Sequence, residues 1–306
     1  MLNSGINIHG EYVRVMFQGT MVALVTPFKN QKVDEDGLGR LVDFHVQSGT
    51  DVICPCGTTG ESATLSFEEH HHVIDIVISA ASGRVPIMAG TGSNNTEEAI
   101  MLTRFAEKAG AAGSLLITPY YNRPSQEGLY IHFQKIAQAV DMPLVLYNVP
   151  SRTGVNLLPE TVERLSCIEN IVGIKEASGS LEQVSEVVNR CGDDFHVVSG
   201  DDVNTLPIMS VGGKGVISVT ANIAPGQVAS MVKAVEDGRF DEARKLHHYL
   251  LQLHNAMFLQ TNPIPAKTAL GMMGIISSEM RLPLCPMPED LNEKLKGVLT
   301  QYKLID

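Results

Sequence analysis

Short apolar runs alternate along this chain with stretches that repeat apolar residues at helical spacing. The apolar runs are rich in Val, Ile and Leu, end at Gly, Pro or polar residues, and occupy positions 21–26, 51–56, 86–89, 114–118, 143–147, 171–175, 195–199 and 215–219. Such runs predict buried strands. The amphipathic stretches between them predict helices near 37–48, 66–81, 96–109, 126–140, 159–165, 181–190, 203–211 and 225–236.

Strand and helix units in strict alternation predict a (β/α)₈ TIM barrel. The nearly continuous apolar strands favour a parallel sheet that is covered on both faces. A doubly wound sheet is the weaker interpretation, because no strand is followed by G-x-G-x-x-G. The barrel is expected over residues 16–236. Further helices near 240–258, 265–273 and 288–302 form an additional C-terminal helical region, residues 237–306. Residues 1–15 lack periodicity and are interpreted as an N-terminal appendage, with disorder as one alternative.

Composition restricts the class of protein. The chain has 306 residues, of which 44% are hydrophobic and 19% are charged, which is ordinary for a globular domain. A net charge of −11 argues against a nucleic-acid partner, which would need a basic face. The five cysteines are odd in number and not spaced as a disulfide framework. With no signal pattern and no long apolar run, they predict a soluble, cytoplasmic protein without membrane contact.

The candidate catalytic and binding residues lie where the predicted strands end. In a barrel of this type, active sites lie at the C-terminal ends of the strands. The residues expected at that end are Thr58, Thr59, Tyr120, Tyr121, Tyr147, Arg152 and Lys175. Lys175 ends an apolar strand, where a lysine is costly to bury unless it has a partner or a chemical role. The alternative is a strand-end lysine whose stem lets the amine reach water.

This combination suits imine chemistry on an α-keto acid. The lysine supplies the attacking amine, a phenol can move protons, and an arginine can bind a carboxylate through two hydrogen bonds. Each element also has a simpler explanation: a tight turn at 57–60, packing of the tyrosines, and a surface position for Arg152. No metal-ligand set is apparent. For the adjacent His70, His71 and His72, solvated helix positions are favoured over a metal cluster, because neighbouring helical residues face different ways.

Several motifs resemble the dihydrodipicolinate synthase family. They are Gly57-Thr-Thr-Gly-Glu-Ser-Ala-Thr64, Pro119-Tyr-Tyr-Asn-Arg-Pro124, Tyr147-Asn-Val-Pro-Ser-Arg-Thr-Gly154, Gly173-Ile-Lys-Glu-Ala-Ser178 and Asn262-Pro-Ile-Pro265. The resemblance runs from about residue 16 to the C-terminal end. It implies a lyase that makes 4-hydroxy-tetrahydrodipicolinate, the first committed step of lysine and diaminopimelate biosynthesis, from pyruvate and L-aspartate 4-semialdehyde. It also implies no cofactor beyond the covalent imine, and a homotetramer built as a dimer of dimers.

The resemblance further assigns roles to residues. Lys175 would form the Schiff base, with a proton relay of Thr58, Tyr121 and Tyr147 in which Tyr121 reaches a neighbouring subunit's site. Thr59 and Tyr147 would hold pyruvate, and Arg152 the carboxylate of the semialdehyde. Gly200 and Ile217 would line the pocket through backbone contacts. A site for lysine, the end product, would comprise Ser62, Ala63, His70, Asn94, Glu98 and Tyr120.

One position departs from the pattern of strongly inhibited members. Phe67 stands where those proteins carry a histidine, and a phenyl ring offers no hydrogen bond to the ligand's ammonium group. Weak inhibition by lysine is therefore expected.

Two other functions remain as alternatives. Another Schiff-base pyruvate aldolase, such as N-acetylneuraminate lyase, resembles this chain at the lysine and the tyrosine. Such lyases typically have Ser-Thr in place of Thr58-Thr59 and lack the arginine found here at position 152. A non-catalytic barrel that only binds a metabolite would be expected to have lost the lysine or a phenol, and this sequence has lost neither.

Overall fold

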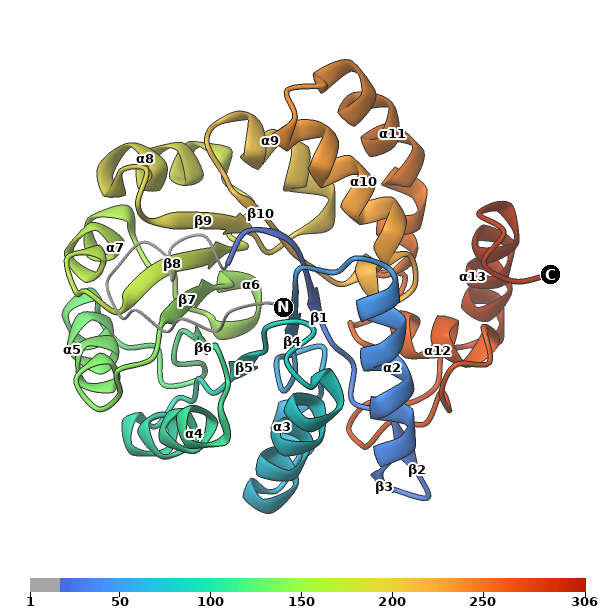
Figure 1. Ribbon diagram of the computed structural model, residues 1–306, viewed down its shortest axis with the longest axis horizontal. Coiled ribbons are helices and arrows are strands. Elements are labelled where there is room, and N and C mark those ends of the chain that lie inside the picture. Colours follow the sequence, from blue (N-terminus) through green and yellow to red (C-terminus); the bar gives the residue numbers. More distant parts are fainter. Residues whose placement is uncertain (1–16) are drawn as a thin grey trace, which may run out of the picture.

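A ring of parallel strands forms the centre of the molecule in the computed structural model, which describes residues 17–306 (Figure 1). The strands are β1 (Gly19–Ala23), β4 (Val52–Cys54), β5 (Met88–Gly90), β6 (Gly113–Ile117), β7 (Leu144–Asn148), β8 (Ile171–Glu176), β9 (His196–Ser199) and β10 (Gly215–Ser218). Their order in the eight-stranded sheet is β4-β1-β10-β9-β8-β7-β6-β5. A parallel bridge between Ile53 and Ile87 joins the two ends of that order. The predicted (β/α)₈ barrel with additional C-terminal helices is confirmed.

Helices surround this ring, as Figure 1 shows. The longer ones on the barrel are α2 (Glu35–Gln47), α3 (Phe67–Ala81), α4 (Thr96–Ala109), α5 (Gln126–Ala137), α7 (Pro159–Ser166), α8 (Leu181–Cys191), α9 (Thr205–Ser210) and α10 (Pro225–Glu236). Short turns of helix follow several strands: η1 (Ser62–Thr64), α6 (Pro150–Thr153), η2 (Asp202–Asn204) and η3 (Thr220–Asn222). The chain ends in α11 (Phe240–Ala256), α12 (Ile264–Met272) and α13 (Glu289–Gln301).

Local sequence signals account for many helix ends. The hydroxyl of Ser66 accepts a hydrogen bond from the backbone N–H of Glu69, whose carboxylate accepts one from the N–H of Ser66. This reciprocal capping box satisfies two backbone donors that a helix start otherwise leaves unpaired, and it begins α3 where the sequence predicts. The predicted bounds 96–109 and 225–236 coincide with α4 and α10.

Several sequence predictions differ from the structure. The first strand covers 19–23 instead of 21–26, because Gly19 pairs with Gly215 and the chain leaves the sheet after Ala23. The predicted helix at 203–211 divides into η2 and α9. A small antiparallel hairpin of β2 (Phe28–Lys29) and β3 (Lys32–Val33) follows β1, where the sequence predicts no strand.

Two layers of apolar side chains hold the barrel together. Inside it, a buried cluster includes Met21, Cys54, Val145, Tyr147 and Ile217. Outside it, the surrounding helices pack on the strands, and the largest cluster continues from the barrel helices into α11, α12 and α13. The predicted boundary at residue 236 stays a prediction, and the predicted appendage at 1–15 lies outside the described residues.

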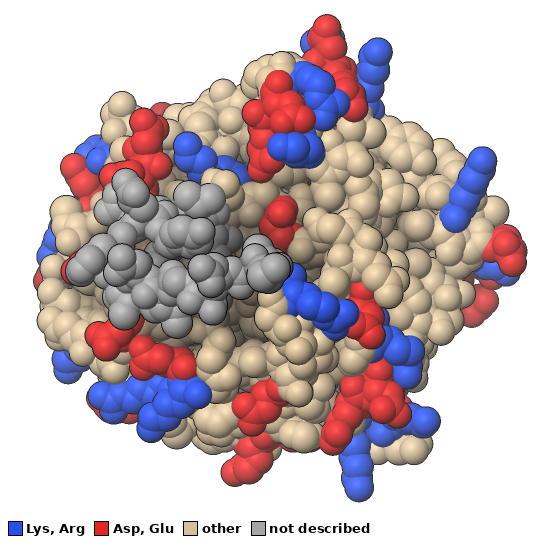
Figure 2. Space-filling model, in the orientation of Figure 1, with Lys and Arg blue, Asp and Glu red and all other residues tan. Residues whose placement is uncertain are grey.

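Charged side chains of both signs are interspersed on the face seen in Figure 2, mostly around its edge. No large field of one sign is visible there outside the grey atoms. Among the helices of residues 17–306, none is both long enough and apolar enough to cross a membrane.

Candidate active site

Lys175 lies near the C-terminal end of β8 and points into the barrel. All six residues of this strand are buried, and Lys175 is 5% exposed. Its Nζ atom lies 4.3 Å from the centre of the Tyr147 ring, because Lys175 pairs with Tyr147 in the register of β8 and β7. The structure thus brings an amine and a phenol together, as the sequence predicts.

The surroundings of Lys175 are apolar and tightly packed. Burial raises the pKa of the Cys54 thiol to about 12, so this neighbour is neutral. A Cβ atom on Gly200 would lie 3.1 Å from both Cγ and Cε of Lys175 and 2.8 Å from the Cβ of Ala177. Because glycine has no Cβ atom, Gly200 leaves room for the aliphatic part of the Lys175 side chain. Ile217 is 1% exposed and belongs, with Tyr147, to the apolar cluster inside the barrel.

The loop after β4 carries the two predicted threonines. Thr58 lines a large cavity, whereas Thr59 is 2% exposed and its Oγ1 accepts a hydrogen bond from Nδ2 of Asn262 at 3.0 Å. The loop is closely packed, since a Cβ atom on Gly60 would lie 3.0 Å from the backbone nitrogen of Cys56. The hydroxyl of Thr26 donates to the carbonyl of Gly60 at 2.7 Å and further fixes the turn.

Arg152 lies on α6, the short helix after β7. Its Nη2 donates to the backbone carbonyl of Asn262 at 3.3 Å, and its side chain lines the same cavity while remaining exposed. Thr153 anchors this helix, with its hydroxyl donating to the carbonyl of Val149 at 3.2 Å. The guanidinium therefore stands at the rim, where a second carboxylate could reach it.

The two tyrosines after β6 are placed differently. Tyr120 is 39% exposed and lines the cavity. Tyr121 is 90% exposed, has a φ of 72°, and does not line the cavity of its own chain. Within residues 17–306, the structure therefore does not bring Tyr121 to Lys175.

One cavity of about 490 Å³ joins the two predicted groups of residues. Thr58, Tyr147 and Arg152 line it, while Lys175 and Thr59 are buried and do not line it. Five of the predicted lysine-site residues also line it, namely Ser62, Ala63, His70, Glu98 and Tyr120, as does Phe67. The sixth, Asn94, is outside the lining but donates to the carbonyl of Tyr120 at 3.1 Å.

The three adjacent histidines require a correction. His70 is buried, not solvated, because it lies on the face of α3 that packs on the barrel, where its Nε2 bonds to the carbonyl of Gly90 at 2.8 Å. Burial lowers the pKa of His70 to about 4, so it is neutral at pH 7. His71 stacks on Phe105 at 3.7 Å, and His72, which is exposed, reaches Glu35. In residues 17–306, no group of three or more His, Cys, Asp or Glu is arranged to hold a metal ion.

The sequence reasoning missed a buried ion pair behind the threonine loop. Lys267 on α12 donates to Oε1 of Glu61 at 2.5 Å, and neither side chain is exposed. The backbone N–H of Arg281 donates to the other oxygen of Glu61 at 3.2 Å, and the Arg281 guanidinium binds both oxygens of Glu69. A lysine among small apolar residues, as in Pro265-Ala-Lys-Thr-Ala, is the signal that could have indicated this pair.

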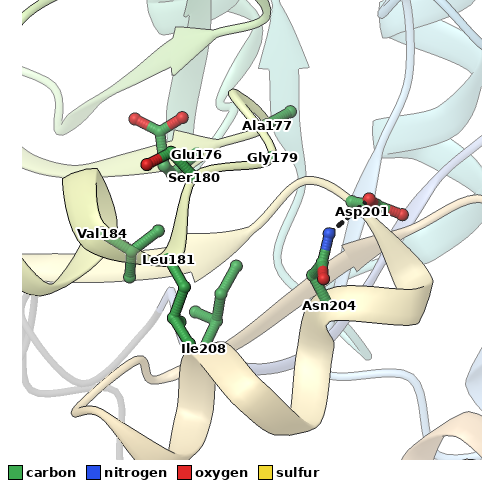
Figure 3. A pocket seen from close by; sticks show the side chains of 9 residues that line it. All are labelled: Glu176, Ala177, Gly179, Ser180, Leu181, Val184, Asp201, Asn204 and Ile208. Atoms are coloured by element: carbon green, nitrogen blue, oxygen red, sulfur yellow. Dashed lines mark hydrogen bonds between the residues drawn. The ribbon is translucent and has the colours of Figure 1, made fainter.

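A second cavity lies between the loop after β8 and the segment after β9, and it is too small for a substrate. Its volume is about 20 Å³, room for one water molecule. Figure 3 shows Asp201 and Asn204, joined by a hydrogen bond of 2.7 Å, across from Glu176 and Leu181. Glu176 is occupied by the amide of Asn148 at 3.1 Å and that of Gln183 at 3.0 Å. These contacts are structural.

Known proteins match this chain over nearly its whole length. The model of the dihydrodipicolinate synthetase family matches residues 16–302. The 4-hydroxy-tetrahydrodipicolinate synthase of Citrifermentans bemidjiense is 60% identical over 95% of this chain and 100% of its own. The crystal structure of dihydrodipicolinate synthase from Aquifex aeolicus has a TM-score of 0.93 and 49% identity, covering 94% of this chain and 99% of that one. The enzyme from Cyanidioschyzon merolae with lysine bound has a TM-score of 0.92 and 40% identity, over 95% and 99% of the two chains.

Proposed function

The chain belongs to the dihydrodipicolinate synthetase family, and we propose from that premise that its barrel condenses pyruvate with L-aspartate 4-semialdehyde through an imine on Lys175. The product is 4-hydroxy-tetrahydrodipicolinate. The observation that carries the assignment of Lys175 is its buried amine, 4.3 Å from the centre of the ring of Tyr147, a residue that lines a substrate-sized cavity. The 60% identical synthase supports this reaction over that of a neuraminate lyase.

The reaction begins with attack by the neutral amine of Lys175 on the ketone carbon of pyruvate. The carbinolamine loses water to give the imine, and loss of a proton from the methyl carbon gives the enamine. The enamine carbon attacks the aldehyde carbon of the semialdehyde, whose oxygen takes up a proton. The amino group of the new chain then attacks the imine carbon, closes the ring and releases the lysine amine. Each proton transfer needs a positioned acid or base.

Tyr147 is the group placed to move these protons, with Thr58 and Tyr121 completing the relay. Thr59, with Tyr147, holds the pyruvate carboxylate, while Gly200 and Ile217 shape the pocket through backbone contacts. Arg152 binds the carboxylate of the semialdehyde, in keeping with its place at the rim of the cavity. The chemistry uses no added cofactor, and dialysis against a chelator should leave the rate unchanged.

Reduction with borohydride tests this function. Incubation with pyruvate and borohydride should fix one three-carbon adduct on the chain, and peptide mass mapping should place it on Lys175. Lys267, the other buried lysine, provides an internal comparison. An adduct on Lys267 or Lys214 with Lys175 unmodified would contradict the mechanism. The Lys175→Arg variant should show no adduct, because a guanidinium is too weak a nucleophile.

The exposure of Tyr121 supports a proposal about assembly. A phenol that is 90% exposed beside the cavity mouth contributes nothing to the site of its own chain. It is placed to enter the site of a second copy, in a homotetramer built as a dimer of dimers. Light scattering should give the tetramer mass, and Tyr121→Ala should lower both kcat and the stability of the dimer.

We place the enzyme in the cytoplasm, in keeping with its five unpaired cysteines.

The part of the cavity beyond the catalytic groups is proposed as a lysine site. Glu98 would pair with the α-ammonium group, and Tyr120 and Asn94 would hold the carboxylate, with Ser62, Ala63 and His70 as the remaining wall. The relative from Cyanidioschyzon merolae that has lysine bound supports this class of ligand. Phe67, which is 46% exposed, offers at most a cation–π contact to the ε-ammonium group, about 0.5–1 kcal/mol at an exposed site. A hydrogen bond to that charge would contribute about 1.5–3 kcal/mol.

Inhibition by lysine should therefore be weak, and Phe67→His should strengthen it roughly ten-fold. The measurement is a titration of initial rate with L-lysine for both proteins, with D-lysine as the control ligand. Tight inhibition of the unmodified chain would contradict this explanation. Equal weakness in both proteins would place the cause elsewhere in the cavity.

A further inference from the structure

Asn262 connects two residues that the proposed function assigns to different substrates. It lies between α11 and α12, is 6% exposed, and lines the large cavity. Its side-chain Nδ2 donates to Oγ1 of Thr59 at 3.0 Å. Its backbone carbonyl accepts from Nη2 of Arg152 at 3.3 Å. The side chain therefore acts on the threonine, and the main chain on the arginine.

The hydrogen bond from Asn262 sets the direction of the Thr59 hydroxyl. A hydroxyl has one proton to donate, and its oxygen can accept through two lone pairs. Because the Thr59 oxygen accepts from Nδ2, its proton is directed away from Asn262. Within residues 17–306, this hydroxyl donates to no protein acceptor. The proton is thus available to a bound anion.

The amide of Asn262 is not explained by stability. Its Oδ1 atom is buried and has no hydrogen-bond partner among residues 17–306. A buried acceptor without a partner costs free energy that an apolar side chain of similar size would avoid. An asparagine at such a position indicates that the donor Nδ2 has a purpose beyond packing.

We propose that Asn262 is a positioning residue that makes Thr59 a hydrogen-bond donor to the carboxylate of pyruvate. The inference rests on the proposed function, because it needs pyruvate bound at Lys175. It adds that the C-terminal segment, which lies about 200 positions from the threonine loop in sequence, controls the binding of the first substrate. The contact of Arg152 with the main-chain carbonyl leaves the second substrate largely independent of this side chain.

Two substitutions of Asn262 give opposite expectations for positioning and for packing. Asn262→Leu removes the donor and leaves Thr59 free to rotate. Asn262→Asp has nearly the same shape, but its carboxylate can only accept, so it turns the Thr59 proton toward itself and adds a negative charge. A positioning role therefore makes Asp more harmful than Leu. A packing role makes the isosteric Asp the milder change.

The experiment measures adduct formation by borohydride as a function of pyruvate concentration, and separately the KM for the semialdehyde. The half-saturating pyruvate concentration should rise about two- to ten-fold for Asn262→Leu, the effect of one neutral hydrogen bond. It should rise about ten- to hundred-fold for Asn262→Asp, while the KM for the semialdehyde changes less than about three-fold. Asn255→Leu and Asn255→Asp, on the exposed face of α11, are the matched controls.

A double substitution tests whether Asn262 acts through Thr59. In a Thr59→Val background there is no hydroxyl to direct, so Asn262→Leu should add less than about two-fold to the pyruvate effect. The proposal is overturned if Asp is milder than Leu, if both substrates are affected equally, or if the two substitutions are additive. Failure of the unmodified chain to form any adduct would contradict the proposed function itself, which separates the two conclusions.

Discussion

Two buried lysines of this protein each lie over an aromatic ring, but they differ in the polar groups around them. Lys175, inside the barrel, has its Nζ 4.3 Å from the ring of Tyr147; Lys267, between α12 and the threonine loop, has its Nζ 4.2 Å from the ring of Phe28. They are 5% and 0% exposed. Only Lys267 has a carboxylate, that of Glu61, at 2.5 Å. Among residues 17–306, Lys175 forms no ion pair.

This difference separates a structural lysine from a chemical one. Burial lowers the pKa of Lys267, and the carboxylate of Glu61 opposes that effect and favours the charged amine. An amine held as a cation by an ion pair cannot attack a carbonyl. Lys175 has a phenol where Lys267 has a phenyl ring, and only the phenol can transfer a proton. Burial alone therefore does not distinguish the two lysines, whereas their neighbours do, and those of Lys175 support the role proposed for it.

Among substitutions that keep both lysines, the largest effect is expected from removing the one oxygen that distinguishes the two aromatic neighbours. Tyr147→Phe makes the surroundings of Lys175 resemble those of Lys267. It should lower kcat by about 10²–10⁴, the usual contribution of a positioned acid or base. Steady-state rates measure this, with Tyr249→Phe on the exposed surface as the control. A kcat within three-fold of the original would remove Tyr147 from the proton relay.

The same substitution at each lysine should lower the free energy of unfolding by different amounts. Lys267→Met leaves the carboxylate of Glu61 buried without its cation and should lower the free energy of unfolding by about 3–5 kcal/mol. Lys175→Met leaves no carboxylate behind and should cost less than about 1 kcal/mol while abolishing activity. Urea denaturation at one fixed protomer concentration measures both.

Adding Glu61→Gln to Lys267→Met should recover most of the lost stability, because the unpaired charge is removed. If the double variant is as unstable as Lys267→Met, the ion pair is not the reason for the loss.

A smaller effect is expected from narrowing the space around Lys175. The Cβ atom of Gly200→Ala would meet Cγ and Cε of Lys175 at 3.1 Å and displace the stem. Overpacking of this kind costs about 1–3 kcal/mol, so kcat/KM for pyruvate should fall about ten-fold. Gly39→Ala is the control, because a Cβ atom there meets nothing within 4 Å. Unchanged kinetics for Gly200→Ala would show that the lysine stem can move without loss.

A further effect, on how stability depends on pH, concerns buried side chains that, like Lys175, have no ion pair. Burial lowers the pKa of His45 to about 3 and that of His132 to about 4, from an ordinary value of 6.5. At pH values between the lowered pKa of each histidine and 6.5, the unfolded chain binds a proton on that histidine that the folded chain does not. Stability should therefore be fully present above pH 6.5 and decrease as the pH falls toward 4, by at most about 1.4 kcal/mol per pH unit for each histidine.

Urea midpoints between pH 7 and pH 4.5 measure this slope. His132→Gln should reduce it, whereas His248→Gln on the exposed face of α11 serves as the control for the substitution itself. A slope that is the same for His132→Gln and the original chain would show that the burial of this histidine has little effect on acid stability.

The sequence by itself determined the architecture and predicted that Lys175 lies at the mouth of the barrel. Strand and helix periodicities are local properties, so α4 and α10 could be predicted to the residue. The rule that barrel sites lie at strand ends placed Lys175 and Tyr147 at the same mouth, and the register of β7 and β8 in the structure pairs them directly. The motifs that carry these residues are continuous in sequence, which is why the family resemblance could be recognised.

Only the tertiary structure decided what lies behind those residues. The pairing of Glu61 with Lys267 and of Thr59 with Asn262 spans 206 and 203 positions. Such contacts depend on how α11 and α12 fold back over the barrel, and no periodicity along the chain encodes that path. The burial of His70 was likewise decided by packing. Helical geometry shows that three adjacent histidines face different sides of the helix, but it does not show which side packs on the core. Local pattern specifies elements and their order, while the partners of buried polar groups follow from the closure of the whole chain.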